Sequence, residues 1–349
     1  MHVEKGGSMA TNLFVMNHEL VWEDPDIFAV RIPYAHLGLG HTNCYIIRSE
    51  GETLVIDPGV ISPAAGRALE KAVDELGVDI TRADFLCTHA HFDHAAQLRN
   101  LVHQGSKIYL GQHTYENNPY HASQESKDAL RNHLKKEGST YLATRGMAAL
   151  SSEVNICDLP GCTYVSLKHN DIVTVGAHQF RVIETPGHAM GHICLYSDKE
   201  KLLISGDHIL ESTTPGLAVP LEGQNPLEAY LESVGKVRSL DCKAVLPGHG
   251  EAFFALKQRC DALVEHHSHR MGQILDVVAA YPGMNGSDVA RTMPWSRSGP
   301  FKHWDRLNPY LRLSMGLQTL AYLKYLTAHG ELVRSEDAMR YHYHISENK

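Results

Sequence analysis

The sequence has few cysteines, and their spacing argues against a disulfide framework and against a structural zinc knuckle. The 349 residues include seven cysteines, and they do not show the paired spacing that such frameworks require. Cys157 and Cys162 lie close together, but no second pair accompanies them. Several cysteines lie within apolar runs, which is typical of a reducing compartment, so we expect a cytoplasmic protein.

Long apolar runs and an excess of positive charge are also missing. No stretch reaches the roughly 20 apolar residues that span a bilayer, and the N-terminal segment lacks a signal-peptide core, so we expect no membrane partner. The formal net charge is −8, which disfavours a dedicated nucleic-acid-binding protein. Residues 1–8 include Gly-Gly-Ser and are not expected to belong to the fold.

The motifs of several common enzyme classes are absent. The sequence has no Gly-x-Ser-x-Gly nucleophile elbow, no glycine-rich phosphate-binding loop and no dinucleotide-binding fingerprint. Serine-nucleophile hydrolysis, P-loop chemistry and nicotinamide chemistry therefore have no support.

Imidazole and carboxylate side chains are instead concentrated in residues 88–94, whose sequence is THAHFDH. These groups are ligands of hydrolytic zinc ions, and a short apolar run typical of a strand precedes them. In an extended segment His89 and His91 project to the same side, while Asp93 and His94 follow in a turn and can reach a second ion. The alternative is a solvated loop in a chain that has 24 histidines.

Three later motifs favour the metal site over the solvated loop. Each places one polar residue at the end of an apolar run, next to a glycine that permits a tight bend: Pro186-Gly187-His188, Ser205-Gly206-Asp207 and Pro247-Gly248-His249. Strand ends that converge on one loop surface commonly build active sites. Any single strand-end histidine is more often structural, but jointly the motifs complete a set of candidate ligands large enough for two ions: His89, His91, Asp93, His94, His188, Asp207 and His249.

On these residues, together with Asp57-Pro58-Gly59, the chain resembles the metallo-β-lactamase-fold hydrolases over about residues 27–252. The resemblance implies an α/β protein with an αββα sandwich and with metals at one edge of the two sheets. It also implies two ligand groups with a shared carboxylate: His89, His91 and His188 for one ion; Asp93, His94 and His249 for the other; and Asp207 as the bridge. Asp57 would orient ligands or cap a turn, and the two roles are compatible.

The resemblance implies two divalent cations, with zinc expected and iron or manganese as alternatives. A water that bridges two such ions loses a proton near neutral pH, and the ions also polarise a substrate carbonyl. Asp93 would be the catalytic residue that orients this hydroxide and shuttles its proton.

The chain length of 349 residues predicts two domains, and a hydrophobic content of 43% is enough to form a hydrophobic core. We expect a catalytic domain at 1–252 and a mostly helical, winged-helix-like domain at 253–349, by likeness to lactamase-β-like and glyoxalase II-like hydrolases. The second domain has 12 lysines and arginines against 9 aspartates and glutamates, so its net charge of +3 is weak support for DNA binding. We expect it to pack against the site, and a homodimer is a further expectation.

The spacing of 94 residues from His94 to His188 indicates a helical insertion at about residues 112–162. It would lie over the metal edge as a substrate lid. Tyr115, Tyr120 and Tyr141 would line a pocket or, alternatively, serve ordinary packing.

Turn and capping patterns predict the other elements. Strands are expected at 27–32, 44–48, 54–56 and 107–110, and helices at 62–76, 95–103, 123–137, 140–150, 225–240, 255–280, 287–292 and 309–329, followed by a two-stranded wing at 330–334 and 339–343. His266, His267 and His269 are expected on a solvated helix face.

Asp207 favours the thioesterase, lactonase and phosphodiesterase branches of the family. The first expectation is hydrolysis of a thioester or related acyl ester, with a small-molecule acyl substrate. The alternatives are a lactonase, a metal-dependent nuclease or phosphodiesterase, a mononuclear-iron persulfide dioxygenase and a non-enzymatic DNA-binding regulator.

Overall fold

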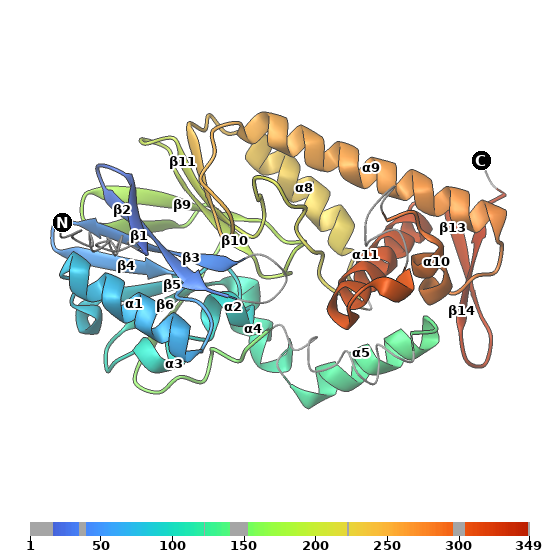
Figure 1. Cartoon of the computed structure of the whole chain (residues 1–349), viewed down its shortest axis with the longest axis horizontal. Helices are drawn as coiled ribbons and strands as arrows, with labels where there is room; N and C mark the ends of the chain where they lie inside the picture. The colour runs from blue at the N-terminus through green and yellow to red at the C-terminus, as the bar shows by residue number, and fades with distance from the viewer. Residues whose placement is uncertain are drawn as a thin grey trace, which may run out of the picture.

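The computed structural model describes residues 17–34, 40–121, 123–139, 153–221, 223–295 and 304–347. In this part of the chain two large β-sheets pack face to face, and helices cover their outer faces (Figure 1). The fold is the expected αββα sandwich, with a helical C-terminal region attached to one side. No helix among these residues is long and apolar enough to cross a membrane.

The larger sheet follows chain order, antiparallel from β1 to β4 and parallel from β4 to β7. Its strands are β1 (His18–Trp22), β2 (Asp26–Pro33), β3 (His41–Ser49), β4 (Glu52–Ile56), β5 (Asp84–Cys87), β6 (Lys107–Gly111) and β7 (Thr163–Leu167). The smaller sheet has the order β12-β11-β10-β9-β8. Its strands are β8 (Ile172–Val175), β9 (His178–Glu184), β10 (Ile193–Ser197), β11 (Leu202–Gly206) and β12 (Ala244–Pro247).

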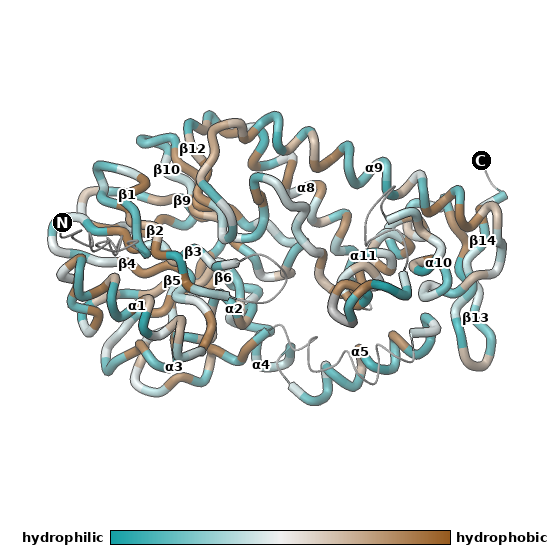
Figure 2. The backbone as a smooth tube through the Cα atoms, in the orientation of Figure 1, coloured by the Kyte–Doolittle hydropathy of each residue, from teal (hydrophilic) through white to brown (hydrophobic). Residues whose placement is uncertain are grey.

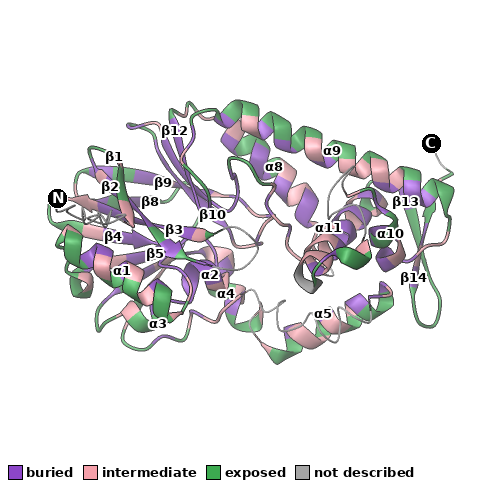
Figure 3. Ribbon diagram, viewed as in Figure 1, coloured by how far each residue is buried: buried purple, intermediate pink, exposed green. Residues whose placement is uncertain are grey.

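Central strands are buried on both faces because one side meets the other sheet and the other side meets helices. In β3, Tyr45 and Ile47 pack between the sheets, whereas Cys44 and Ile46 pack beneath α1 (Pro63–Leu76). Figure 2 shows brown, hydrophobic residues along much of both sheets, and Figure 3 shows the matching buried residues in purple. The buried faces fix which strand ends meet at the sandwich edge.

Helix α1 begins and ends where the sequence predicts. The Ser62 hydroxyl accepts a hydrogen bond from the Ala65 amide at 3.0 Å, and Pro63 occupies the first turn. Gly77 ends the helix with a left-handed φ of 62°, a conformation that favours glycine.

The predicted helix at 95–103 is wrong. The chain instead forms two short helices, α2 (Phe92–Ala95) and α3 (Leu98–Leu101). Gly59 explains the interruption, because its amide donates to the His94 carbonyl and its carbonyl accepts from the Gln97 amide. These long-range hydrogen bonds hold the candidate ligand segment against the loop after β4.

The C-terminal region has the expected helices and paired strands. They are α9 (Leu256–Ala280), α10 (Gly286–Thr292), α11 (Pro309–Ala328), β13 (Leu332–Glu336) and β14 (Tyr341–Ile345), and they follow the expected helix α8 (Pro226–Arg238). Apolar residues of α8, α9 and α11 share one core with the outer face of the smaller sheet. The division at residue 252 and the winged-helix assignment stay predictions.

The prediction of a solvated histidine face on α9 is wrong for one residue. His267 is fully buried, and its Nδ1 lies 2.7 Å from the Tyr322 hydroxyl of α11. His266 is partly buried and His269 is exposed. The local pattern on α9 predicts exposure of His267, but the contact with Tyr322 on the later helix α11 buries it.

The insertion contains α4 (Gln112–His121) and α5 (Gln124–Lys136), and α5 lies beside the C-terminal region (Figure 1). The helix expected at 140–150, with Tyr141, lies outside the described residues. Tyr115 and Tyr120 are exposed and line neither cavity described below, so the pocket role expected for them is wrong. Tyr115 packs against Tyr164, with 5.9 Å between ring centres.

A buried carboxyl joins the insertion to the C-terminal region. The Tyr343 hydroxyl donates to Oε1 of Glu137 at 2.8 Å, and the Ser287 amide donates to the Glu137 carbonyl. Burial raises the pKa of the Glu137 carboxyl to about 7, against the favourable effects of Tyr343 and Arg334. Among the described residues the carboxyl has no ion pair with a lysine or an arginine; His133 Nε2 lies 3.9 Å from Oε1, and Oε2 has no hydrogen-bond partner.

Replacing Glu137 with glutamine is expected to remove a pH dependence of stability. The folded protein holds this proton more tightly than the unfolded chain does, so the free energy of unfolding falls as pH rises from about 4.5 to about 7. The loss amounts to about 3 kcal/mol, because each pKa unit corresponds to about 1.4 kcal/mol. Urea unfolding of wild type and Glu137→Gln at pH 5 and pH 8 should show the variant gaining stability relative to wild type at pH 8. Glu336→Gln, which changes an exposed carboxylate that pairs with Lys136, is the control. A difference between Glu137→Gln and wild type that does not change with pH would contradict the prediction.

Candidate metal centre

The ends of four strands meet at one edge of the sandwich. The segments after β5, β9, β11 and β12 carry the candidate ligands, and the Gly248 amide donates to the Gly206 carbonyl at 2.8 Å. Close approach requires glycine at two of these bends. A Cβ on Gly248 would lie 2.4 Å from Asp207 Oδ1, and one on Gly187 would lie 2.5 Å from Tyr230 Cα.

Three histidines form the first ligand group. His188 Nε2 lies 3.3 Å from His89 Nε2 and 3.0 Å from His91 Nδ1. Ligands that bind one tetrahedral zinc with bonds of 2.0–2.1 Å are separated by about 3.3 Å. Both separations from His188 therefore match the spacing that one ion needs, and the three ligand atoms lie within 4.8 Å of one another.

Asp93, His94 and His249 form the second ligand group. The Nε2 atoms of His94 and His249 are 3.3 Å apart, and His249 Nε2 lies 3.5 Å from Asp93 Oδ2. All three side chains are buried, so their polar atoms have little access to solvent.

Asp207 lies between the two groups. Its Oδ2 is 3.6 Å from His188 Nε2 and 3.4 Å from His249 Nε2, so one carboxylate oxygen faces both groups. Its Oδ1 is buried, lies 3.5 Å from His94 Nε2 and has no hydrogen-bond partner among the described residues. A buried carboxylate oxygen that lacks a hydrogen bond among imidazoles fits a cation-binding role better than a purely structural contact.

The outward nitrogen atoms of the histidines are held by acceptors. His188 Nδ1 donates to the Gly216 carbonyl at 2.8 Å, and His249 Nδ1 donates to the His41 carbonyl at 2.7 Å. These bonds place the protons on the outward nitrogen atoms and leave the inward nitrogen atoms as lone-pair donors, as metal-binding histidines require.

The hydrogen bonds of Asp57 fit the orienting role that the resemblance suggests. Its Oδ1 accepts from the Thr88 amide at 2.8 Å, and its Oδ2 accepts from the Thr88 hydroxyl at 2.6 Å and from His94 Nδ1 at 2.9 Å. Because the Thr88 hydroxyl proton goes to Asp57, its oxygen can accept from His89 Nδ1, 3.0 Å away. One buried carboxylate thus orients a histidine in each ligand group.

The charges and pKa values of the buried side chains also favour the binding of cations. Burial, reinforced by neighbouring imidazoles, holds the pKa of His89 well below its usual value. Burial also disfavours a charged His249, but the carboxylates of Asp207 and Asp93 outweigh it and raise the pKa to about 10. The buried carboxylates therefore need positive charge beside them, and a proton or a metal ion can supply it.

The structure adds neighbours that the sequence interpretation missed. His192 is buried, its Nδ1 lies 2.7 Å from the Thr185 hydroxyl, and its Nε2 accepts from the Asp207 amide at 3.2 Å. His192 therefore positions the backbone of Asp207. In the sequence, His192 follows Gly191 and precedes an apolar strand, whereas the candidate ligands lie after the ends of strands. His208 is also buried beside the site, and neither ring nitrogen has a hydrogen-bond partner among the described residues.

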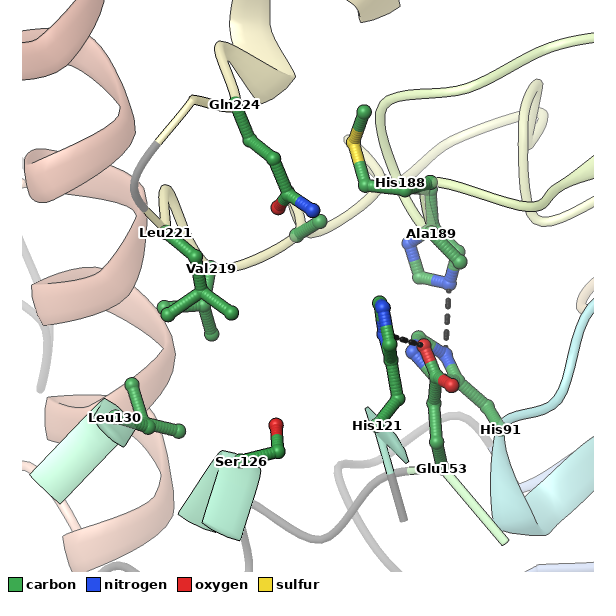
Figure 4. A pocket seen from close by; sticks show the side chains of 12 residues that line it. His91, His121, Ser126, Leu130, Glu153, His188, Ala189, Val219, Leu221 and Gln224 are labelled. Atoms are coloured by element: carbon green, nitrogen blue, oxygen red, sulfur yellow. Dashed lines mark hydrogen bonds and ion pairs between the residues drawn. The ribbon is translucent and has the colours of Figure 1, made fainter. Parts of the chain in front are cut away.

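Two cavities open from the ligand groups. The larger, of about 390 Å³, reaches from Asp93 and Asp207 to α11. The smaller, of about 90 Å³, lies between the first ligand group and α5, which agrees with the expected position of the insertion. Figure 4 shows His121 and Glu153 at its polar side, near His91. His121 Nδ1 lies 3.3 Å from Glu153 Oε1.

This combination of fold and clustered ligands defines a metal-dependent hydrolase built on an αββα sandwich. The family model described as the metallo-beta-lactamase superfamily matches residues 37–249, and the chain belongs to this superfamily.

The chain is also similar to individual proteins. The "Probable metallo-hydrolase YqjP" of Bacillus subtilis is 28% identical over 253 residues, which are 69% of this chain and 75% of that protein. The crystal structure of a beta-lactamase domain protein from Burkholderia ambifaria superposes with a TM-score of 0.74 at 25% identity, and covers 97% of this chain and 98% of its own. The atrochrysone carboxyl ACP thioesterase of Aspergillus fumigatus is 24% identical over 237 residues, which are 67% of this chain but 58% of that protein.

Proposed function

We propose that this protein is a dinuclear, zinc-dependent hydrolase of thioesters or related acyl esters. The observation that carries the proposal is the pair of ligand groups, spaced for two ions around Asp207, at one end of a mostly apolar cavity. His89, His91 and His188 would hold one ion; Asp93, His94 and His249 would hold the other.

A pair of bound divalent cations supplies hydroxide at neutral pH and polarises the substrate carbonyl. The protein groups supply orientation and proton transfer. Asp93 is buried in the first turn of α2 with Oδ2 facing the second ligand group, where a carboxylate can take and return a proton. Asp57 and the carbonyls of Gly216 and His41 fix the ligand imidazoles, so little reorganisation is needed during turnover.

The lining of the cavities favours an uncharged acyl substrate over a phosphodiester. Neither cavity has a lysine or arginine among the described residues that line it. A nucleic-acid backbone is bound mainly through such cations. The thioesterase among the similar proteins supports the same choice. A lactone, which presents the same carbonyl chemistry, is the second candidate.

The test is a substrate panel on protein whose metal content has been measured. Acyl thioesters, oxygen esters, lactones, a bis(aryl) phosphate and a persulfide should be compared before and after chelation and metal replacement. We expect two metals per chain and the highest kcat/KM with an acyl thioester or ester. One iron per chain with oxygen uptake would indicate the persulfide dioxygenase instead, and preference for the phosphodiester would indicate a nuclease.

A further inference from the structure

The larger cavity has an apolar wall built from parts of the chain that are far apart in sequence. One side is the loop that follows Asp207, and the other side is α11. The leucines that line it are Leu210, Leu217, Leu311, Leu313 and Leu317. The other polar groups on the described wall, away from the ligand groups, are neutral hydroxyls and an amide, as in Thr213, Ser314 and Gln318.

The loop that forms this wall is fixed in place. Arg259 of α9 donates from Nε to the Leu210 carbonyl at 2.6 Å and from its terminal nitrogen to the Thr213 carbonyl at 2.7 Å. The guanidinium thus satisfies backbone oxygens and is not among the residues that line the cavity. Because Arg259 fixes the backbone of this loop, the cavity wall is preorganised to bind an apolar group.

The smaller cavity differs in chemistry. Around its rim it offers the His121–Glu153 pair, the Ser126 hydroxyl and the Gln224 amide, while Leu130 and Leu221 form its apolar side (Figure 4). His91 and His188 line both cavities, as do Ala218 and Val219. The two cavities therefore meet beside the first ligand group, where a scissile carbonyl has to lie.

From this arrangement, and resting on the proposed acyl-ester hydrolysis, we infer that the leucine-lined cavity binds the acyl chain and the smaller cavity binds the leaving group. The preferred substrate is then an ester or thioester with an uncharged aliphatic acyl chain of medium length. Its leaving group, an alcohol or a thiol, carries hydrogen-bonding groups. Burial of each additional methylene against leucine side chains favours the longer acyl chain, while His121, Glu153 and Gln224 favour a polar leaving group.

The inference is tested by crossing two variants with two series of substrates, using the metal-loaded protein. One series varies the acyl chain from acetyl to decanoyl on a single thiol, and the other varies the thiol or alcohol on a single acyl group. Wild type should show a kcat/KM that rises with chain length to a maximum. Leu317→Phe, which narrows the larger cavity, should lower kcat/KM for the best long-chain substrate by about tenfold or more and leave the acetyl substrate within about twofold. Gln224→Ala should alter how kcat/KM depends on the leaving group. It should leave the dependence of kcat/KM on acyl-chain length unchanged.

Met315→Phe is the matched control, because Met315 is a partly buried residue of the same helix that does not line either cavity. It should leave both profiles as in wild type. Equal loss for acetyl and long-chain substrates in Leu317→Phe, or a changed chain-length profile in Gln224→Ala, would overturn the assignment of the cavities while leaving the hydrolase function intact. Wild type with two metals that hydrolyses no acyl ester of any length would instead overturn the proposed function itself.

Discussion

Replacing Asp207 with alanine is expected to lower kcat/KM by at least about a thousandfold and to reduce the bound metal below two per chain. A thousandfold loss corresponds to about 4 kcal/mol of activation free energy. The reason is that a single oxygen of the Asp207 carboxylate lies 3.6 Å from His188 Nε2 and 3.4 Å from His249 Nε2 and so faces both ligand groups. Without this oxygen the two cation positions lose both their shared ligand and a negative charge.

The measurement is metal content per chain together with steady-state kinetics on the best substrate of the panel. Thermal unfolding of the metal-free proteins shows whether the variant folds, because this comparison does not depend on the ions. Asp198→Ala is the control, since Asp198 forms an exposed ion pair with Arg181 away from the site. Full metal content with unchanged turnover in Asp207→Ala would reject the bridging role.

The convergence of the candidate ligands could be predicted from the sequence because local patterns mark these residues. Each ligand follows a short apolar strand and, for three of them, a glycine, and buried strands force their ends to a common edge. The structure brings all seven predicted residues together there. Helix α1 was equally predictable, because Ser62 and Gly77 act on their own neighbours in the chain.

Features that depend on distant partners were not predictable in this way. The break between α2 and α3 arises from hydrogen bonds to Gly59, and the burial of His267 arises from Tyr322 on a later helix. His192 lies at the start of a strand, and only the fold places it against Asp207. The apolar wall of the larger cavity likewise depends on how α11 packs against the loop that contains Leu217, and no local pattern contains that packing.

The same distinction explains why the sequence could suggest a hydrolase but could not rank its substrates well. The capacity to bind metal depends on histidine and aspartate residues, whose clusters are recognisable in the sequence itself. The acyl preference that we infer depends on leucines such as Leu313 and Leu317, which in the sequence look like ordinary core residues of α11. Their second role becomes visible when one end of the cavity they line is found to contain Asp93 and Asp207.

Replacing Asp93 with asparagine is expected to lower kcat by about a hundredfold to ten-thousandfold, the range associated with a lost general acid or base. The change keeps the size of the side chain but removes its charge and its ability to carry a proton. Because Asp93 Oδ2 also lies 3.5 Å from His249 Nε2, the second ion should bind more weakly. The first ligand group contains no atom of Asp93, so its ion should remain.

Two roles of Asp93 can be separated by adding metal. If Asp93 were only a ligand, saturating metal would restore both the stoichiometry and kcat of Asp93→Asn. If it also transfers a proton, kcat stays low at two metals per chain, and the pH dependence of kcat changes shape because one titrating group has been removed. Asp84→Asn is the matched control, since Asp84 lies at the opposite end of β5 and pairs with Lys107. Wild-type kcat in metal-saturated Asp93→Asn would show that proton transfer does not pass through this carboxylate, and would leave it as a ligand alone.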